Sequence, residues 1–591
     1  MKKSLLAVVI LAASIALVGC TKKKKDIGKV LHMPVPMAVK GFDPIHASDK
    51  YASDEIGKVY EGLLQYHYLK RPYELIPNLA EALPTVSEDG STYTFKVKKG
   101  ILFQDNEAFP GGKGRELVAA DFVYSIKRVA DPKLQSTGWW VLDGKIAGLN
   151  EWRKENSSKK VVDYSSVVEG LKALDKYTIQ FKLTKPFPQF LYSLAMPFHF
   201  AVAREVVEKY KKEFLNHPVG TGPFQLTSKF NAQTRKITYI KNPTFRDKFY
   251  PTEGSEGDKE KGLLGSAGKK IPLVDKIEVS IIEEEQTRWL NFKKGNLDFN
   301  SIPKDDFANA ITPSKDLTPE MNKKGMKLHI AASLDVTYSA FQHTDPLFKD
   351  NKKLRQAMSL GYDIKKVNEL FYNGTAQPAQ SIVPPGISGF MPSYNSPFRG
   401  RDLEGAKKLL ASAGYPEGKG LPEILFEHIG TSPTSRQMAE FFQKNMSDLG
   451  INIRLSSNSW PELLKKIRTR TAQMWGIAWG ADYPDAENFL QLLYGPNQTP
   501  GANGSNYNNS EFNTLFKKAA IMQAGPERKA LYEKLNRIAA EEVPLIYGVH
   551  RTSFVIAQGW LKNFKATEFT GERAQYLGLD LDLKGKLAKE F

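Results

Sequence analysis

Cysteine is almost absent from this chain of 591 residues, because Cys20 is the only one. No intrachain disulfide and no cysteine-rich metal site can therefore form. The nine histidines show no ligand spacing, which makes a metal cage of protein side chains improbable. Beyond Val18 the sequence lacks any apolar stretch long enough to span a membrane. We therefore expect the bulk of the protein to lie in water, without a metal or other cofactor.

The common catalytic motifs are missing as well. There is no His-Glu-x-x-His, no Gly-x-Ser-x-Gly and no cysteine downstream of Cys20 to act as a nucleophile. Gly111–Gly114 lacks the spacing of a phosphate-binding Walker motif and is more simply a turn. The acidic runs Glu283–Glu285 and Asp305–Asp306 could serve a hydrolase, but such runs are usually solvated faces. We therefore expect no catalysis, with a hydrolase as the alternative that turnover of a peptide or glycan would support.

The first twenty residues differ from the rest of the chain. Lys2 and Lys3 form a basic start, Leu5–Val18 is an apolar run, and Cys20 follows Gly19. This arrangement resembles the lipobox of bacterial lipoproteins, in which a signal peptide is removed and the cysteine is acylated. The resemblance implies an exported protein, tethered to a membrane by lipid on Cys20, in the periplasm or at the cell surface. A small buried hydrophobe and a reactive thiol are the other interpretations of Cys20.

Positive charge is in excess, with a formal net charge of +18. Lys22–Lys25 supply four of these charges directly after Cys20. Such a run can rest on anionic lipid headgroups, at about 1 kcal/mol per lysine, or act as a solvated tether. Nucleic acid is the other common partner of a basic protein, but the sequence contains no basic-aromatic motif of a known nucleic-acid reader. We therefore expect no nucleic-acid partner.

The chain is too long for one hydrophobic core, so two or more lobes are expected. Alternating apolar and polar residues predict strands at Tyr93–Val97 and Tyr177–Leu183. Helical spacing predicts a helix through Ile56–Leu63 and two more that Asp121 and Asp402 cap. Strands interleaved with helices throughout the chain indicate mixed α/β lobes.

The most distinctive stretch is Met474–Asp485. An apolar, aromatic run of strand length ends here in Gly-Ala-Asp-Tyr-Pro-Asp, a turn composition. One carboxylate, Asp482, thus lies at the mouth of a buried segment, beside Trp479 and Tyr483. Aromatic walls with a single carboxylate suit an organic cation, such as the free amino group of a peptide. A turn-capping aspartate is the other interpretation of Asp482.

The order of several short motifs is similar to that of solute-binding protein family 5, the peptide- and nickel-binding receptors of bacterial ABC importers. The similarity runs from about Val30 to Trp560. Each motif is weak by itself, whereas their order and spacing together are specific. The motifs are Phe42-Asp43-Pro44, Tyr60-Glu61-Gly62-Leu63, Leu79-Ala80-Glu81, Asp89-Gly90, Asp121–Ser125, Pro218–Phe224, Ala406–Pro416, Trp479–Pro484 and Asn506–Phe512.

The resemblance implies an α/β fold of the periplasmic-binding-protein type II, in which two lobes enclose a ligand by hinge closure. It also implies an additional subdomain in the first lobe, and a monomer that delivers its peptide ligand to an ABC permease and ATPase. The expected division is a signal peptide (1–19), a tether (20–29), a first lobe (30–60, 203–334 and 544–591), the extra subdomain (61–202) and a second lobe (335–543).

The resemblance also implies a ligand site. In peptide-binding members an aspartate shortly after a tryptophan holds the peptide ammonium, and Asp482 after Trp479 matches that pattern. Such a pair is worth roughly 4 kcal/mol before desolvation, at about 4 Å and an effective dielectric near 20. Main-chain groups of 478–480 and 48–50 match segments that pair with an extended ligand, and Trp460 matches an aromatic pocket residue, with core packing as its alternative. The expected ligand-binding set is Ser48, Asp49, Lys50, Tyr51, Trp460, Ala478, Trp479, Gly480, Asp482 and Tyr483.

One position departs from the family pattern. Receptors that hold a tripeptide carboxylate through an arginine six positions before the aspartate would need it at Gly476. Arg436, Arg468, Arg470 or Lys50 could take its place, so the ligand length stays open. The cargo stays open too: a nickel chelate, haem, an oligosaccharide or a signalling peptide would suit the same fold, and a sensor or adhesin would suit the same tether.

Labelling with radioactive palmitate in a bacterial host tests the lipid anchor. We expect the wild-type protein to be labelled and Cys20→Ala to remain unlabelled, because the cysteine is the acylated residue of a lipobox. Equal labelling of the two proteins, or none of the wild type, would refute the assignment.

Overall fold

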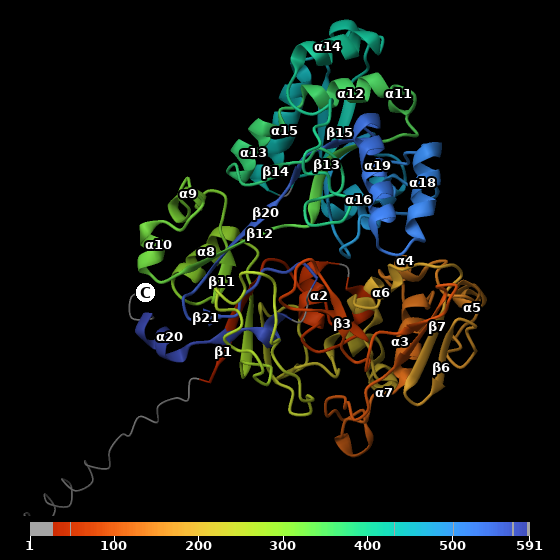
Figure 1. Ribbon diagram of the computed structural model, residues 1–591, viewed down its shortest axis with the longest axis vertical. Helices are drawn as coiled ribbons and strands as arrows, with labels where there is room; N and C mark the ends of the chain where they lie inside the picture. The colour runs from red at the N-terminus through yellow and green to blue at the C-terminus, as the bar shows by residue number, and fades with distance from the viewer. Residues whose placement is uncertain (1–27, 48, 431, 500, 570–572, 588–591) are drawn as a thin grey trace, which may run out of the picture.

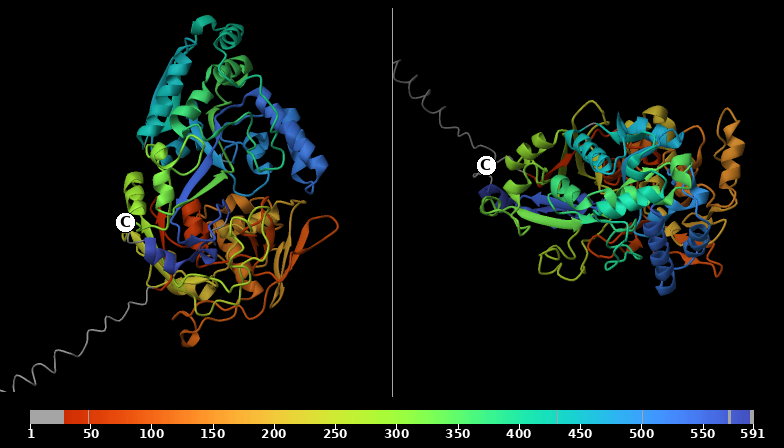
Figure 2. Two further views of the ribbon diagram at one scale, coloured as in Figure 1. Left: turned by 60° about the vertical axis from the view of Figure 1, so that its left-hand side comes forward. Right: turned by 90° about the horizontal axis from the view of Figure 1, so that it is seen from above.

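The computed structural model describes residues 28–47, 49–430, 432–499, 501–569 and 573–587. Cys20 and Ser48, to which the sequence assigns the lipid and a ligand contact, lie outside these ranges. Two lobes are joined by strands that run from one to the other (Figures 1 and 2). This confirms the expected two-lobed α/β fold. No helix within the described ranges has the length and apolar character that crossing a membrane requires.

The first lobe is built on a four-stranded sheet with the order β1-β10-β9-β8. β1 and β10 are parallel, and the remaining neighbours are antiparallel. Every second residue of β1 is buried, namely Leu31, Met33 and Val35, so one face of the sheet covers the core. The strands of this sheet are β1 (Val30–Val35), β8 (Phe224–Leu226), β9 (Lys236–Lys241) and β10 (Lys276–Ile281). Two short two-stranded sheets and three helices accompany it, namely β2 (Leu64–Tyr66) with β3 (Leu75–Pro77), β21 (Leu561–Lys562) with β22 (Gly578–Leu579), α2 (Lys50–Ile56), α7 (Arg204–Tyr210) and α20 (Leu581–Leu587).

The extra subdomain has its own four-stranded antiparallel sheet, β4-β5-β7-β6, against which α3 packs. Both strands that alternation predicts are present, as β5 and β7. Asp121 does not cap its helix as we expected: α3 begins two residues earlier, and the Asp121 carboxylate accepts a hydrogen bond from the backbone of the cap residue Val118. The elements are β4 (Thr85–Val86), β5 (Thr92–Lys96), β6 (Leu171–Asp175), β7 (Thr178–Lys182), α3 (Ala119–Ala130), α4 (Trp139–Leu142), α5 (Leu149–Ser157) and α6 (Phe190–Ser193).

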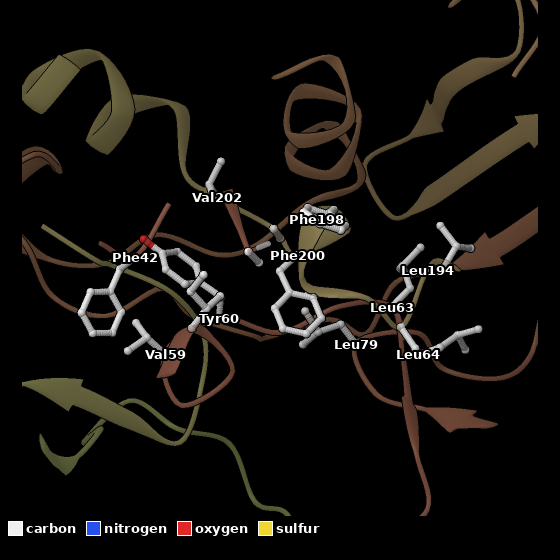
Figure 3. Close-up of a cluster of buried hydrophobic side chains, with 14 of the residues drawn as sticks. Phe42, Val59, Tyr60, Leu63, Leu64, Leu79, Leu194, Phe198, Phe200 and Val202 are labelled. Atoms are coloured by element: carbon white, nitrogen blue, oxygen red, sulfur yellow. The ribbon is translucent and has the colours of Figure 1, made fainter. Parts of the chain in front are cut away.

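A continuous apolar core joins this subdomain to the rest of the first lobe. Figure 3 shows Phe42 and Tyr60 beside Phe200 and Val202, which come from the end of the subdomain segment. Gly62 permits this approach, because a Cβ at that position would lie 2.9 Å from the Phe200 ring. The two parts are therefore packed as one body.

The helix through Ile56–Leu63 is shorter than its spacing predicts. α2 ends at Ile56, and the chain enters β2 at Leu64. The carbonyl oxygen of Val59, which a continuing helix would use, instead accepts a hydrogen bond from the Gly222 amide at 2.8 Å. Tertiary pairing with a glycine turn thus overrides the local pattern.

Strands β12 and β20 carry the chain between the lobes (Figure 1). β20 lies between β11 and β12 in a three-stranded antiparallel sheet. At the crossing, the Ser333 amide donates to the Arg551 carbonyl at 2.9 Å, and Arg551 Nε donates to the Asp335 carboxylate at 2.6 Å. The two crossing segments therefore form one paired hinge. The strands of the three-stranded sheet and the helices that pack with it are β11 (Phe299–Ser301), β12 (Lys327–Ala332), β20 (Thr552–Ala557), α8 (Glu285–Lys293), α9 (Phe307–Ala310) and α10 (Pro319–Lys323).

The second lobe contains a five-stranded sheet with the order β16-β15-β17-β13-β18. β15 is parallel to β16 and to β17, and β13 is antiparallel to its two neighbours. β18 extends this sheet beyond residue 543, where we expected the second lobe to end. Asp402 caps α14 through the Gly405 amide, as predicted. The elements are β13 (Asp335–Phe341), β14 (Gln377–Pro378), β15 (Ile424–Ile429), β16 (Ile453–Asn458), β17 (Met474–Gly480), β18 (Leu545–Tyr547), β19 (Val549–His550), α11 (Pro346–Lys349), α12 (Lys352–Gly361), α13 (Ile364–Tyr372), α14 (Leu403–Ser412), α15 (Pro433–Ser447), α16 (Trp460–Arg468), α17 (Glu487–Leu490), α18 (Ser510–Ala520) and α19 (Pro526–Glu542).

A buried ion pair fixes the start of the first lobe to the subdomain. Asp43 accepts hydrogen bonds from both terminal nitrogens of Arg128, at 3.0 and 2.8 Å, and both residues are buried. We expect Asp43→Ala to lower the free energy of unfolding by about 3–5 kcal/mol, because it leaves the buried guanidinium without its counter-charge. Urea unfolding measures this loss. Glu169→Ala, which breaks an exposed pair with Lys182, should leave the free energy of unfolding nearly unchanged, because solvent screens such a pair. An equal cost for the two variants would contradict the prediction.

Candidate functional site

The Asp482 turn follows the carboxyl end of β17. β15, β16 and β17 run in the same direction, so their carboxyl ends meet at one edge of the sheet. The hinge leaves from this edge as well, because Gly480 at the end of β17 pairs with Asp335 at the start of β13. Ligands of open α/β sheets bind outside the carboxyl ends of the strands. The turn is thus positioned between the second lobe and the first.

Asn488 holds Asp482 in place. The Asn488 Oδ1 atom accepts hydrogen bonds from the Asp482 amide at 3.0 Å and from Trp479 Nε1 at 3.1 Å. Its Nδ2 atom donates to Asp482 Oδ2 at 2.9 Å. Asn488 is fully buried, so one neutral side chain fixes the orientation of both the carboxylate and the indole.

The two carboxylates of the turn have different partners. Asp485 is buried, and both of its oxygens accept hydrogen bonds from Arg528 Nη2, at 2.8 and 2.9 Å; Tyr532 adds a third at 3.0 Å. Asp482 forms no ion pair with any described residue. Burial raises its pKa to about 6, and the hydrogen bond from Asn488 opposes that rise. Asp485 is neutralised within the protein, whereas Asp482 keeps a charge that a cationic ligand can satisfy.

Aromatic side chains from both lobes gather beside this carboxylate. The ring of Tyr483 lies parallel to that of Tyr192 in the first lobe, with centroids 6.0 Å apart. Tyr192 lies parallel to Tyr66 at 6.4 Å, and Tyr66 in turn contacts Tyr73 and Phe569. Burial raises the pKa of Tyr66 well above its ordinary value, and the charge of Asp482 contributes to that rise. Tyr483 and Tyr66 thus bring aromatic surface from both lobes to the neighbourhood of this carboxylate.

One side of β17 is available for pairing. Its ladder with β13 runs along the whole strand, from Met474 to Gly480. Its ladder with β15 includes only Met474 and Trp475. Within the part of the chain that the structure describes, the main chain of 476–480 has no strand partner on the β15 side. These residues include Ala478, Trp479 and Gly480, for which we expect main-chain pairing with a ligand.

The predicted first-lobe segment lies at the start of α2. The Asp49 carboxylate caps this helix by accepting from the amides of Tyr51 and Ala52, at 3.0 and 2.9 Å. Lys50 Nζ donates to the carbonyl oxygens of Thr567 and Glu568, both at 3.1 Å. The ammonium of Lys50 is thus already held by the protein. Tyr51 is partly buried, and burial raises the pKa of its hydroxyl.

Trp460 lies at the same edge of the second-lobe sheet, because it opens α16 two residues after β16 ends. Its side chain is 46% exposed, so core packing, the alternative that its sequence allows, is not what the structure shows.

Gly476 stands where the family pattern would place an arginine. A Cβ at Gly476 would lie 3.1 Å from the Phe426 ring, which occupies the space beside that position.

Two of the arginines that could replace the missing one are engaged within the protein. Arg470 donates to Thr499, and Arg436 donates to the Gly430 carbonyl. The ammonium of Lys50 is held as well. Of the four expected candidates, Arg468 is therefore the one whose side chain makes no hydrogen bond or ion pair to the residues that the structure describes. Sequence reasoning also missed Asn488, Tyr66 and Tyr192 altogether, because nothing local marks them as neighbours of Asp482.

Metal ligation has no geometric basis in the described part of the chain, where no group of three or more His, Cys, Asp or Glu side chains could hold an ion. The site offers instead one charged acceptor, aromatic surfaces and an unpaired strand edge. Such an arrangement can bind an extended ligand that has a cationic end.

Known proteins share this fold and about a quarter of the residues of this sequence. Residues 74–501 match the family described as bacterial extracellular solute-binding proteins, family 5 Middle. Heme-binding protein A of Haemophilus influenzae is 28% identical over 562 residues, which cover 92% of this chain and 91% of that protein. The dipeptide-binding protein of Escherichia coli is 28% identical over 498 residues, 81% of this chain and 82% of that protein. The periplasmic binding protein DppA of Helicobacter pylori, solved with the peptide STSA, has a TM-score of 0.72 at 24% identity, covering 93% of this chain and 98% of that one, a likeness in fold.

The raised pKa of Asp482 predicts a pH-dependent stability. Because the folded-state pKa of about 6 exceeds the ordinary value, the folded protein binds this proton more tightly than the unfolded chain. The free energy of unfolding therefore falls as the pH rises from about 4 to about 6. We expect Asp482→Asn to raise it by about 2 kcal/mol at pH 7.5 and to change it little at pH 4, as measured by urea unfolding.

Asp485→Asn is the matched control. It removes the counter-charge of the buried Arg528, so it should lower the free energy of unfolding by about 3 kcal/mol at pH 7.5. An effect of Asp482→Asn that is the same at both pH values would show that the carboxyl does not titrate in this range.

Proposed function

The chain belongs to the bacterial extracellular solute-binding proteins of family 5, and on that premise we propose that it is the substrate-binding component of an ABC-type peptide importer. The observation that carries this proposal is the state of Asp482. This carboxylate lies at the interlobe edge without an ion pair among the described residues, while its neighbour Asp485 is fully engaged by Arg528 and Tyr532. A peptide ammonium supplies the missing charge.

The proposed binding mode uses the main chain of both partners. An extended peptide adds to the open side of β17 at 476–480, next to its ladder with β13. Main-chain pairing reads no side chain, so it accepts peptides of many sequences. The free amino group then lies at Asp482, held by Asn488 and flanked by Trp479. Asp49, Lys50 and Tyr51 with Trp460 complete the proposed walls.

Enclosure follows from the hinge. Two segments cross between the lobes in the part of the chain that the structure describes, and they are hydrogen-bonded to each other at Ser333 and Arg551. Two paired crossings allow the lobes to rotate as bodies about one short axis. The ligand is held in the closed form and passed to the permease on opening. The protein performs no chemistry on it, as befits a member of a binding-protein family.

The proposal includes a location. The lipobox-like stretch before Cys20 supports export and acylation, and Lys22–Lys25 then lie next to the membrane surface. A monomer tethered in this way, in the periplasm or on the cell surface, delivers cargo to a permease in the same membrane system.

Haem is the second candidate cargo. The similarity to a haem-binding relative covers 91% of that protein. The rings of Tyr66, Tyr73, Tyr192 and Phe569 would also suit a flat macrocycle. Asp482 favours the peptide, because an unpaired carboxylate attracts an ammonium and repels the propionates of haem.

Calorimetric titration with trialanine and with N-acetyl-trialanine tests the peptide assignment. We expect acetylation and Asp482→Asn each to weaken binding by about 100-fold, because each leaves one member of a desolvated charge pair without its partner. We expect the two changes combined to cost little more than either alone, since they remove the same interaction.

Glu440→Gln, at an acid of the second lobe on the surface of α15, is the control and should bind like the wild type. Equal affinity for free and acetylated peptide would overturn the amine assignment. Haem titration followed by absorbance, and chromatography for peptide fragments, show whether either the second cargo or a hydrolase explains the protein better.

A further inference from the structure

The extra subdomain contacts the second lobe at the Asp482 turn. α6 lies below the lower ends of α18 and α19 in Figure 1. Tyr192 of α6 stacks on Tyr483, the residue next to Asp482, with an interplanar angle of 4°. These rings come from different lobes, so their contact exists only while the lobes are together.

Gln189 forms a second contact of this kind. Its side chain is 1% exposed. In the amide orientation that satisfies both ends, its oxygen accepts from Arg528 Nη2 and its nitrogen donates to the Ala520 carbonyl at 3.2 Å. Arg528 is the residue that holds Asp485, at the other end of the same turn. The subdomain therefore reaches the turn from both sides.

A pair of opposite charges faces the same boundary. Burial lowers the pKa of Lys145 in the subdomain, and the negative charge of Glu487 opposes that shift. Burial raises the pKa of Glu487, and Lys145 opposes it in turn. Glu487 also accepts the hydroxyl hydrogen bond of Tyr483. The charges of Lys145 and Glu487 thus attract each other between the lobes, in addition to the two contacts above.

We propose that Tyr192 and Gln189 are positioning residues that couple lobe closure to the ligand-binding orientation of Asp482. Asn488 fixes the carboxylate from within the second lobe. Tyr483 and Arg528 fix the flanks of its turn, and the subdomain supports both of them from the first lobe. We call these two contacts, Tyr192 with Tyr483 and Gln189 with Arg528, the clasp. The clasp holds the lobes together around the bound ligand and so sets the rate at which ligand dissociates. This inference rests on the proposed function for the identity of the ligand, whereas the clasp itself rests on the contacts between lobes.

Stopped-flow kinetics with trialanine test the clasp. We expect Tyr192→Ala and Gln189→Ala each to raise the dissociation rate constant about tenfold or more and to leave the association rate constant within about threefold. The reason is that ligand enters the open form, in which these contacts are absent, and leaves the closed form only after they break. Tyr192→Phe should bind like the wild type, since the stacked ring is retained. An unchanged dissociation rate in Tyr192→Ala, or the same defect in Tyr192→Phe, would overturn the proposal.

Tyr210→Ala is the matched control, because Tyr210 is also a stacked tyrosine of the first lobe but lies on His217, 3.9 Å away, rather than on the second lobe. It should leave both rate constants unchanged. If trialanine does not bind the wild type, that result contradicts the proposed function and leaves the clasp to be tested separately. The radius of gyration from small-angle scattering without peptide then decides about the clasp: a larger value for Tyr192→Ala than for Tyr210→Ala supports it, and equal values overturn it.

Discussion

Among the described residues, a neutral amide alone holds the partly buried carboxylate of Asp482, and the rest of this site depends on that constraint. Asn488 satisfies one oxygen of Asp482 and none of its charge. Burial makes that charge costly, which its raised pKa expresses. Three residues further along the chain, Asp485 shows the alternative, in which an arginine and a tyrosine remove the cost within the protein. The turn therefore combines two acids with different roles. Asp485 stabilises the fold, whereas Asp482 has a negative charge that no described residue neutralises.

The surrounding architecture places the charge of Asp482 where a ligand between the lobes can reach it. β17 ends at the hinge edge of the sheet, so the charge lies where the two lobes meet. The same strand leaves five residues without a partner on the β15 side within the described structure. Charge, aromatic rings and an open main-chain edge thus converge on one strand end. Each would be unremarkable by itself, and their combination specifies a ligand that is extended and cationic at one end.

Local sequence patterns predicted the secondary-structure elements well but did not predict the tertiary contacts between them. The alternation of Tyr93–Val97 and the cap at Asp402 predicted β5 and α14, because both signals lie within a few residues of the element. The prediction that the helix continues beyond Ile56 to Leu63 was wrong. The Val59 carbonyl instead accepts a hydrogen bond from a glycine turn more than 160 residues away. The assignment of Asp482 to the ligand came from its aromatic neighbours and from the family resemblance, and it stays a prediction. Nothing in the sequence pointed to Tyr192 or Asn488, because only the folded chain brings a tyrosine from one lobe against the turn of the other.

The position of β20 has a consequence for how the polypeptide is made. This strand lies in the middle of its sheet, between β11 and β12, yet it is synthesised about 220 residues after β12. The second lobe is in effect an insertion between these two neighbours and has all its own strands before β20 emerges. Such sequence-distant pairing slows the completion of a fold. The second lobe thus has all of its strands before β20 is available, whereas the sheet of β11 and β12 in the first lobe stays incomplete until β20 has been made.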